Sequence, residues 1–303
     1  MNTISVIGAG TMGNGIAHCF AQHEFEVCLM DISQENLELA KINIEKNLAR
    51  MIKKELITEE EQKKIISRIS YHTEFENKII NSQLIIEAAT ESKKIKINIF
   101  KELDKLCSPN TILATNTSSI SISEIAKATN RENKIIGMHF MNPVPIMKLV
   151  EVIKGNQTDQ ATINQIIKIS EMLQKVPVLV NDAPGFVANR ILLPMINEAI
   201  HALTEKVSGV QEIDTVMILG MSHPMGPLQL ADFIGLDVCL SILNILYDGF
   251  KNEKYKPNPL LEKMVQIGQL GVKTKKGFYD YSEGIKNKKV NTQVLSFNNN
   301  SDL

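Results

Sequence analysis

The strongest constraint on the fold is a glycine-rich turn between two apolar segments at the N-terminus. Thr3 to Ile7 predicts a strand, and Ile16 to Phe20 lies in a predicted helix. The turn has the pattern Gly-x-Gly-x-x-Gly, which in this strand–turn–helix context is typical of dinucleotide binding. Its glycines permit the tight turn, the approach of a pyrophosphate and helix–strand packing, while the helix N-terminus offers N–H groups to the phosphates. The residues predicted to contact the dinucleotide are Gly8, Ala9, Gly10, Thr11, Met12 and Gly13.

A carboxylate follows the second predicted strand. Phe25 to Met30 is short and apolar, and Asp31 comes directly after it, close to the spacing of an acid that binds the adenosine ribose. Such a carboxylate accepts hydrogen bonds from the 2′-hydroxyl and repels a 2′-phosphate, so the sequence favours NAD over NADP. The simpler alternative is a glycine turn followed by an ordinary helix-capping Asp.

The order of the predicted elements indicates two domains. Strand and helix patterns alternate as far as about residue 180, which predicts a doubly wound, Rossmann-type α/β domain over residues 1–182. From Phe186 onward only helical patterns occur, including Leu228 to Phe250 as one segment, so an all-α domain is expected over residues 186–282. Residues 283–303 are rich in Lys, Asn and Ser and are expected to form a mobile tail.

A single His stands between apolar residues near the end of the first predicted domain. Ile135 to Phe140 and Met147 to Ile153 both predict strands, and an Asn-Pro-Val-Pro turn separates them. If the turn folds these strands back on each other, His139 and Glu151 come within hydrogen-bond reach. An imidazole oriented by a carboxylate is a general base that works near neutral pH. The simpler alternative is a core His beside an unrelated surface Glu.

Composition excludes several classes of function. The 303 residues carry a net charge of −1 and are 44% hydrophobic, without a long uncharged apolar run, so neither nucleic-acid nor membrane binding is expected. No signal peptide is expected, and the cysteines are scattered, which favours buried thiols in a reducing compartment such as the cytoplasm. No metal site, Walker loop or Gly-x-Ser-x-Gly motif is predicted. The four cysteines are Cys19, Cys28, Cys107 and Cys239.

Further motifs follow the glycine turn in a fixed order, as far as about residue 282. They are Glu87-Ala88-Ala89, Asn116-Thr117-Ser118-Ser119, the His139 segment, Ala183-Pro184-Gly185-Phe186 with Asn189-Arg190, His223-Pro224-Met225-Gly226-Pro227 and Gly277-Phe278-Tyr279-Asp280-Tyr281. With the glycine turn, this series resembles the short-chain L-3-hydroxyacyl-CoA dehydrogenase family, and most closely its bacterial 3-hydroxybutyryl-CoA dehydrogenase type.

The resemblance implies roles for individual residues. His139 matches the family's catalytic base, which takes the proton of the 3-hydroxyl as C3 delivers hydride to the nicotinamide, and Glu151 matches its orienting carboxylate. Ser118 matches the serine that hydrogen-bonds the substrate oxygen beside the cofactor. Asn189 matches the asparagine that completes the site from the second domain. Further cofactor-side positions are matched by Glu91, Lys96, Asn142 and Lys273.

These assignments have simpler alternatives. Ser118 could be only a helix-entry residue and Asn189 only an N-cap. Lys96 could be one more charge on a solvated helix face, where other lysines already lie. The predicted helix 33–54 ends in a basic run, which could be a solvated face with cations near a helix C-terminus. The resemblance instead places the CoA substrate against this helix, at Lys54 and at Asn47, which stands where some members have a serine.

The resemblance implies an NAD-dependent enzyme that interconverts short-chain (3S)-3-hydroxyacyl-CoA, such as 3-hydroxybutyryl-CoA, and 3-oxoacyl-CoA. It also implies a homodimer formed through residues 186–282. Two alternatives stay open: a sugar-acid dehydrogenase with the same fold and a non-CoA substrate, and a non-catalytic, crystallin-like NAD-binding protein. The presence of Ser118, His139, Glu151 and Asn189 argues against the last alternative. The short length and the CoA-type motifs argue against the sugar-acid enzyme.

Overall fold

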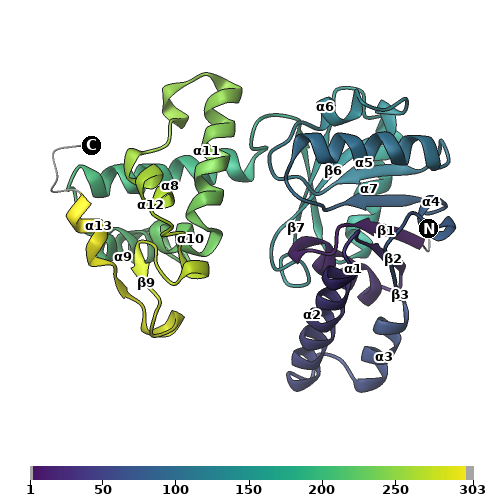
Figure 1. Cartoon of the computed structure of the whole chain (residues 1–303), viewed down its shortest axis with the longest axis horizontal. Coiled ribbons are helices and arrows are strands. Elements are labelled where there is room, and N and C mark those ends of the chain that lie inside the picture. The colour runs from purple at the N-terminus through teal and green to yellow at the C-terminus, as the bar shows by residue number, and fades with distance from the viewer. Residues whose placement is uncertain (1–2, 298–303) are drawn as a thin grey trace. The chain divides into compact units, whose positions relative to one another are not determined.

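A computed structural model describes the backbone of residues 3–297 and the side chains of residues 3–294. The chain divides into two compact units, Met1–Phe186 and Val187–Leu303, which are drawn in Figure 1. We refer to them as the N-terminal unit and the C-terminal unit and describe each by itself.

The N-terminal unit is built on an eight-stranded sheet of order β3-β2-β1-β4-β5-β6-β7-β8. The strands from β3 to β6 are parallel, β6 and β7 are antiparallel, and β7 and β8 run parallel to each other. The strand order reverses at β1, and doubly wound sheets bind ligands beyond the carboxyl ends of the strands at such a point. The predicted doubly wound α/β class is therefore confirmed. The strands are β1 (Thr3–Ile7), β2 (Glu26–Met30), β3 (Ile69–His72), β4 (Leu84–Glu87), β5 (Ile112–Thr115), β6 (Ile135–Phe140), β7 (Leu149–Lys154) and β8 (Val176–Asn181).

Helices cover both faces of this sheet (Figure 1). On one face the apolar core includes Ile4 and Val6 of β1 and residues of α1, α2 and α7. On the other face Ile85 of β4 packs with residues of α5 and α6, including Phe100. Because both faces are covered at the centre of the sheet, β4 and β5 are buried along their whole length. The helices are α1 (Thr11–Gln22), α2 (Gln34–Lys53), α3 (Glu59–Ser67), α4 (Asn77–Ile80), α5 (Lys93–Leu106), α6 (Ile122–Ala126) and α7 (Gln160–Met172).

The C-terminal unit is a helical bundle. The segment expected as one helix over Leu228 to Phe250 is two helices, because Gly235 has a φ of 101° and the helices on either side of it are bent by 98°. Within residues 3–297 no single helix is long and apolar enough to span a membrane, and these two reach that length only as a bent pair. The elements are α8 (Ala188–Thr204), α9 (Val210–Met221), α10 (Pro227–Ile234), α11 (Leu236–Phe250), α12 (Pro259–Gln266), β9 (Tyr279–Asp280), β10 (Lys289–Val290) and α13 (Thr292–Phe297).

The expectation of a mobile tail over residues 283–303 is wrong for its first half. Strand β10 pairs with β9, and the Asn291 side chain donates hydrogen bonds to Gln269 Oε1 (2.8 Å) and Gly277 O (2.7 Å). Val294 is fully buried in the core of the C-terminal unit. A few well-placed contacts therefore hold a segment whose average composition is polar. The rest of the predicted tail, residues 298–303, lies outside the described residues.

Two buried aspartates tie the β9 segment to the bundle. Asp232 of α10 accepts hydrogen bonds from the backbone N–H groups of Phe278 and Tyr279, both at 2.9 Å, and from the Tyr281 hydroxyl at 3.0 Å. Asp214 of α9 accepts one from the Tyr279 hydroxyl at 2.8 Å. Burial, partly offset by these hydrogen bonds, raises the pKa of Asp232 to about 7, and burial also raises the pKa of Asp214.

Candidate active site

The glycine turn has the shape that a dinucleotide requires. Gly8 has a φ of 100°, and a Cβ there would lie 2.7 Å from the backbone oxygen of Ala88. A Cβ on Gly13 would overlap Gly8 O at 1.7 Å, whereas a Cβ on Gly10 would have no neighbour within 4 Å. The backbone at Gly10 is therefore open to an approaching phosphate. No side chain caps α1, whose N-cap is Gly10, so its first N–H groups are available to an anion, and the turn fits the pyrophosphate of NAD.

Asp31 supports this turn from the end of β2. Its Oδ2 accepts a hydrogen bond from Ala9 N at 2.8 Å, and its Oδ1 accepts one from Ser33 N at 2.9 Å. The N-cap of α2 is Ser33, so the alternative that Asp31 is only a helix cap is wrong. The carboxylate is half-buried at the end of the strand, beside the turn, where a ribose-binding acid is expected.

Hydrogen bonds, most of them between backbone groups, bring four segments together at the carboxyl ends of the strands. Ala88 N donates to Ile7 O at 2.7 Å, which places the chain after β4 beside the glycine turn. Asn116 N donates to Glu87 O at 2.7 Å, and Asn116 Oδ1 accepts from Phe140 N at 2.9 Å. The loop after β5 is thereby joined to the end of β6. The glycine turn, the Ser118 loop and the His139 segment consequently share one edge of the sheet.

His139 and Glu151 face each other on the antiparallel strands β6 and β7. They are register partners, and His139 Nδ1 lies 2.7 Å from Glu151 Oε2. The side chains of both are buried, and Glu151 is only 2% exposed, so the alternative of an unrelated surface Glu is wrong. With Nδ1–H donating to the carboxylate, Nε2 is the nitrogen that exchanges a proton with another group. Asn142 lies just beyond β6, in the connection to β7.

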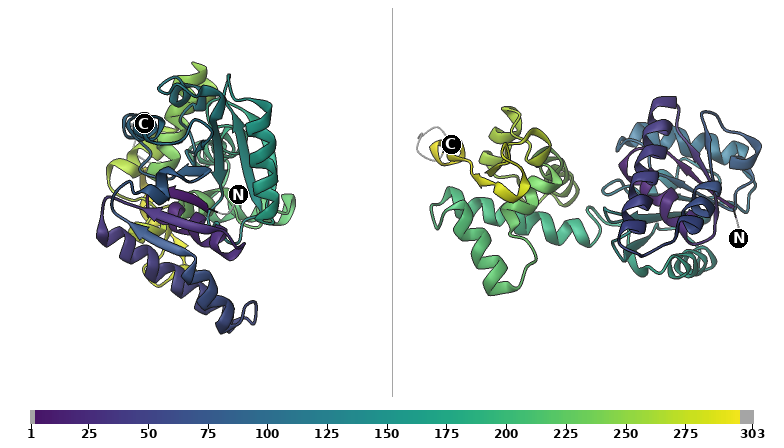
Figure 2. Two further views of the ribbon diagram at one scale, coloured as in Figure 1. Left: turned by 90° about the vertical axis from the view of Figure 1, so that its right-hand side faces the viewer. Right: turned by 90° about the horizontal axis from the view of Figure 1, so that it is seen from below.

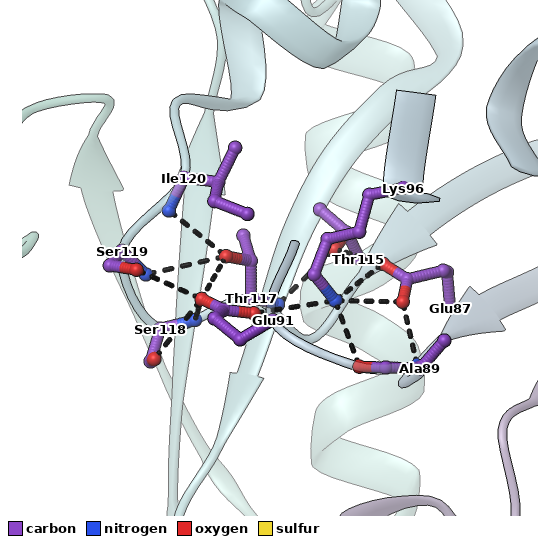
Figure 3. Close-up of polar contacts among 9 residues, drawn as sticks. All are labelled: Glu87, Ala89, Glu91, Lys96, Thr115, Thr117, Ser118, Ser119 and Ile120. Carbon is purple, nitrogen blue, oxygen red and sulfur yellow. Dashed lines mark hydrogen bonds and ion pairs between the residues drawn. The ribbon is translucent and has the colours of Figure 1, made fainter. Parts of the chain in front are cut away.

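Glu91 holds the loop that carries Ser118 (Figure 3). Its Oε1 accepts hydrogen bonds from the Thr117 hydroxyl at 2.6 Å, Ser118 N at 2.9 Å, Ser118 Oγ at 3.2 Å and the Ser119 hydroxyl at 2.9 Å. The N-cap of α6 is Ser121, so Ser118 is not the capping residue of that helix. One carboxylate oxygen thus fixes three consecutive residues of the loop.

Lys96 lies behind this loop in a buried charge cluster. It is 1% exposed, and its Nζ contacts Glu87 Oε1 at 2.7 Å and Glu91 Oε2 at 3.4 Å (Figure 3). The alternative of a charge on a solvated helix face is therefore wrong. Burial raises the pKa of Glu87, which Lys96 partly offsets. For Glu91, burial is outweighed by Lys96 and the loop donors, and its pKa is lowered.

Glu87 is a site residue that sequence reasoning did not assign. Besides Lys96, its carboxylate accepts hydrogen bonds from the Thr115 hydroxyl and from Ala89 N, both at 2.7 Å. A signal was present in the sequence, because Glu87 ends an otherwise apolar buried strand and Lys96 follows nine residues later on the next helix. A charge at that place needs a partner of opposite sign.

Two of the predicted site residues belong to the C-terminal unit. Asn189 is the second residue of α8, whose N-cap is Val187, so the alternative that Asn189 caps this helix is wrong. Lys273 forms an ion pair with Asp237, with Nζ 2.5 Å from Oδ1. Their roles beside the N-terminal unit stay predictions.

The predicted CoA contacts lie at the C-terminal end of α2. Lys54 is the C-cap of this helix and is exposed, and Arg50 donates a hydrogen bond to Asn47 Oδ1 at 3.3 Å. Figures 1 and 2 show that α2 extends beyond the strands on which it packs. Its basic end is therefore accessible to an anionic ligand.

Within residues 3–294, no group of three or more His, Cys, Asp or Glu side chains could hold a metal ion. The four cysteines are free thiols and are buried. Burial raises the pKa of Cys19 to about 11 and that of Cys239 to about 12, so neither thiol is primed for nucleophilic chemistry.

A dinucleotide turn, an acid at the end of β2 and a His–Glu couple at the same sheet edge define a Rossmann-type, NAD-dependent oxidoreductase. Residues 3–183 match the family described as 3-hydroxyacyl-CoA dehydrogenase, NAD binding domain, and residues 185–281 match its C-terminal domain. The chain therefore belongs to the 3-hydroxyacyl-CoA dehydrogenase family.

Individual relatives agree with this assignment. The chain is 51% identical to a probable 3-hydroxybutyryl-CoA dehydrogenase of Bacillus subtilis, over 92% of this chain and 97% of the relative. It is 50% identical to the 3-hydroxybutyryl-CoA dehydrogenase of Clostridioides difficile, over 92% and 99%. The crystal structure of (S)-3-hydroxybutyryl-CoA dehydrogenase from Ralstonia eutropha has a TM-score of 0.90 and 45% identity, covering 93% of this chain and 99% of that one.

Proposed function

We propose that the protein interconverts (3S)-3-hydroxybutyryl-CoA, or a similar short-chain 3-hydroxyacyl-CoA, and the 3-oxoacyl-CoA, with NAD as the hydride carrier. The observation that carries this proposal is the His139–Glu151 hydrogen bond at the edge of the sheet that also carries the dinucleotide turn. Family membership and the names of the relatives support the thioester class of substrate.

Gly8 to Gly13 and Asp31 would hold the cofactor. The open backbone at Gly10 and the N-terminus of α1 suit the pyrophosphate, and Asp31 suits the hydroxyl groups of the adenosine ribose. When bound, NAD supplies the hydride acceptor of the oxidative reaction. Glu91, Lys96 and Asn142 would lie on the cofactor side of the site, together with Lys273 from the C-terminal unit.

His139 is the proposed general base in the oxidative direction and the general acid in the reductive direction. Its Nδ1–H is committed to Glu151, so Nε2 takes the proton of the substrate 3-hydroxyl. The imidazolium that forms then lies beside a buried carboxylate, which stabilises it. Glu151 thereby fixes the tautomer and favours proton removal.

Ser118 and Asn189 are the proposed hydrogen-bonding partners of the reacting oxygen. The Glu91 carboxylate fixes the backbone of Ser118 through Ser118 N, while the Ser118 hydroxyl, which donates to Glu91 at 3.2 Å, would turn to the substrate oxygen when substrate binds. The CoA moiety would lie along α2, where Lys54 attracts its phosphates and Asn47 offers a polar contact. We place these four residues in the substrate site on the family resemblance and on their chemistry.

The substrate class is tested by steady-state reduction with NADH of acetoacetyl-CoA, longer 3-oxoacyl-CoA thioesters and free acetoacetate. We expect turnover of the short thioester and poor turnover of the free acid. Reduction of the free acid as well as the thioester would contradict the CoA assignment and favour the sugar-acid class.

We also propose that the protein is a homodimer formed through its C-terminal unit. Several apolar side chains of α8 and α9 are exposed there, including Ile191, Val216 and Leu219. Val216 and Leu219 are three residues apart on α9 and therefore lie on the same side of this helix, and exposed apolar patches are typical of protein interfaces. The four free thiols support a reducing compartment, which we propose is the cytoplasm.

A further inference from the structure

The ring of Phe186 lies against the ring of His139. The two ring centroids are 6.0 Å apart and the planes are tilted by 57°, within the range of aromatic pairs in proteins. Phe186 is 2% exposed and belongs to the apolar cluster that includes residues of α5 and α6. The imidazole of His139 is therefore hydrogen-bonded to a carboxylate at Nδ1 and packed beside the ring of Phe186.

A tight turn determines where this ring lies. Phe186 N donates a hydrogen bond to Ala183 O at 2.9 Å, Pro184 is the second residue of the turn, and Gly185 is the third with a φ of 71°. This combination is a type II β-turn, whose third position favours glycine. Asp182 anchors the start of the turn, because its carboxylate accepts hydrogen bonds from the Ser121 hydroxyl (2.7 Å) and Ser123 N (2.8 Å).

The backbone of Phe186 is itself unusual. Its φ of 51° lies in the left-handed region, which bulky side chains rarely adopt. Filling an apolar core does not require such a backbone, since Phe100 packs in the same cluster from an ordinary helix. Residues held in rare backbone conformations cluster at functional sites, where the surrounding structure maintains them. From this conformation the Phe186 ring packs beside the imidazole of His139.

We propose that Phe186 is a positioning residue for His139. Its ring limits the tilt of the imidazole, so that Nδ1 stays directed at Glu151 and Nε2 keeps a fixed direction for proton transfer. The proposal rests on the proposed role of His139 as the general base. Small displacements of a catalytic group lower the rate strongly, because proton transfer depends on distance and angle.

The test compares Phe186→Leu with Phe100→Leu. Both substitutions shorten a buried side chain of the same apolar cluster, and both should lower the melting temperature. We expect Phe186→Leu to lower kcat for acetoacetyl-CoA by about 10- to 100-fold with little change in KM for NADH. Phe100→Leu should leave kcat close to the wild-type value. Equal kcat in the two variants would overturn the proposal.

A spectroscopic readout separates positioning from general destabilisation. The Nδ1 proton of His139 should give a downfield nuclear magnetic resonance signal, assigned by its absence in His139→Gln. We expect Phe186→Leu to shift or broaden this signal and Phe100→Leu to leave it in place. The proposal requires both a changed signal and a lower kcat in Phe186→Leu. An unchanged signal would overturn it even if kcat falls, and so would a changed signal with wild-type kcat.

If Phe186→Leu does not fold, Gly185→Ala is the second variant. This variant keeps the Phe186 ring but places a Cβ on a backbone with positive φ, so it should displace Phe186. We expect it to lower kcat and to change the Nδ1 proton signal. A wild-type kcat together with a wild-type signal would overturn the proposal. The proposed function can fail separately. If His139→Gln is fully active, His139 is not the base, whereas the Nδ1 signal still reports whether Phe186 positions the imidazole.

Discussion

Three polar side chains at the candidate site are each held by a carboxylate. Glu151 bonds to His139, Glu91 bonds to Ser118, and Glu87 neutralises Lys96. Buried carboxylates are costly unless they are paired and hydrogen-bonded, and the two buried ones, Glu151 and Glu87, have such partners here. These pairs hold the imidazole, the serine loop and the lysine in place before substrate binds, which lowers the reorganisation that the reaction requires.

At Asp31 the prediction concerns cofactor choice. The carboxylate lies beside the glycine turn, so the wild type should have a higher kcat/KM for NADH than for NADPH. Asp31→Ser with Ile32→Arg should reduce this preference at least tenfold, because a repelling charge is replaced by an attracting one. Ile32 is 88% exposed, so Ile32→Arg alone is a control that keeps the carboxylate. Equal use of both cofactors by the wild type would refute the role of Asp31.

Lys54 carries a second prediction at this scale. Lys54→Glu should raise KM for acetoacetyl-CoA several-fold, more at low ionic strength, because an exposed cation contributes about 1 kcal/mol or less and is screened by salt. Values of kcat and of KM for NADH should change little. The matched control is Lys63→Glu, since Lys63 is an exposed lysine of the neighbouring helix α3. The CoA assignment of α2 fails if both variants behave alike.

At the scale of elements, the sequence predicted what depends on local pattern. The strand–turn–helix at Gly8, the strands around His139 and the register of Glu151 all follow from apolar runs and turn residues. Gly235 was missed, because an apolar segment with one glycine also fits a continuous helix. Glu87 and Phe186 were missed for another reason: their roles depend on residues distant in sequence that only the tertiary structure brings close.

The buried Asp232 makes the stability of the C-terminal unit depend on pH. Its pKa is about 7 in the folded chain and about 3.9 in an unfolded one, so the folded state binds the extra proton. The stabilisation from this proton is fully present below about pH 4 and is lost as pH rises through about 7. Asp232→Asn should remove this change in the free energy of unfolding, which amounts to a few kcal/mol, on the order of 1.4 kcal/mol for each unit of pKa difference. The variant also changes the hydrogen bonds at this position.

Urea unfolding from pH 4 to pH 8 measures this change. The wild type should lose stability relative to Asp232→Asn across this interval. Parallel stability curves for the two proteins would show that Asp232 does not titrate in this range. Asp214 also has a raised pKa, and its charge raises the pKa of Asp232, so the two carboxylates titrate together and the comparison reports the loss of the coupled pair's Asp232 member.

At the scale of the whole molecule, average composition did not predict the extent of the fold. A charge balance of 33 basic and 34 acidic residues gave no sign of nucleic-acid binding. The polar C-terminal segment was expected to be mobile, yet Asn291 and Val294 pack into the C-terminal unit. A few contacts can order a polar segment, and average composition does not report them.

Assembly gives a prediction at the same scale. If the exposed apolar face of α9 forms the dimer interface, Leu219→Glu should convert the protein to a monomer, since it places a charge in an apolar interface. Light scattering measures the mass of both proteins. Lys63→Glu is the control charge change and should leave the dimer intact. A monomeric, active wild type would contradict the proposed homodimer.

The most direct measurement is the kcat of His139→Gln with acetoacetyl-CoA and NADH, together with the affinity for NADH. We expect kcat to fall by about 10²–10⁴-fold, because the proton-transfer step loses its acid or base. NADH affinity should stay close to that of the wild type, since the dinucleotide turn and Asp31 are untouched. Near-wild-type turnover in this variant would contradict the mechanism.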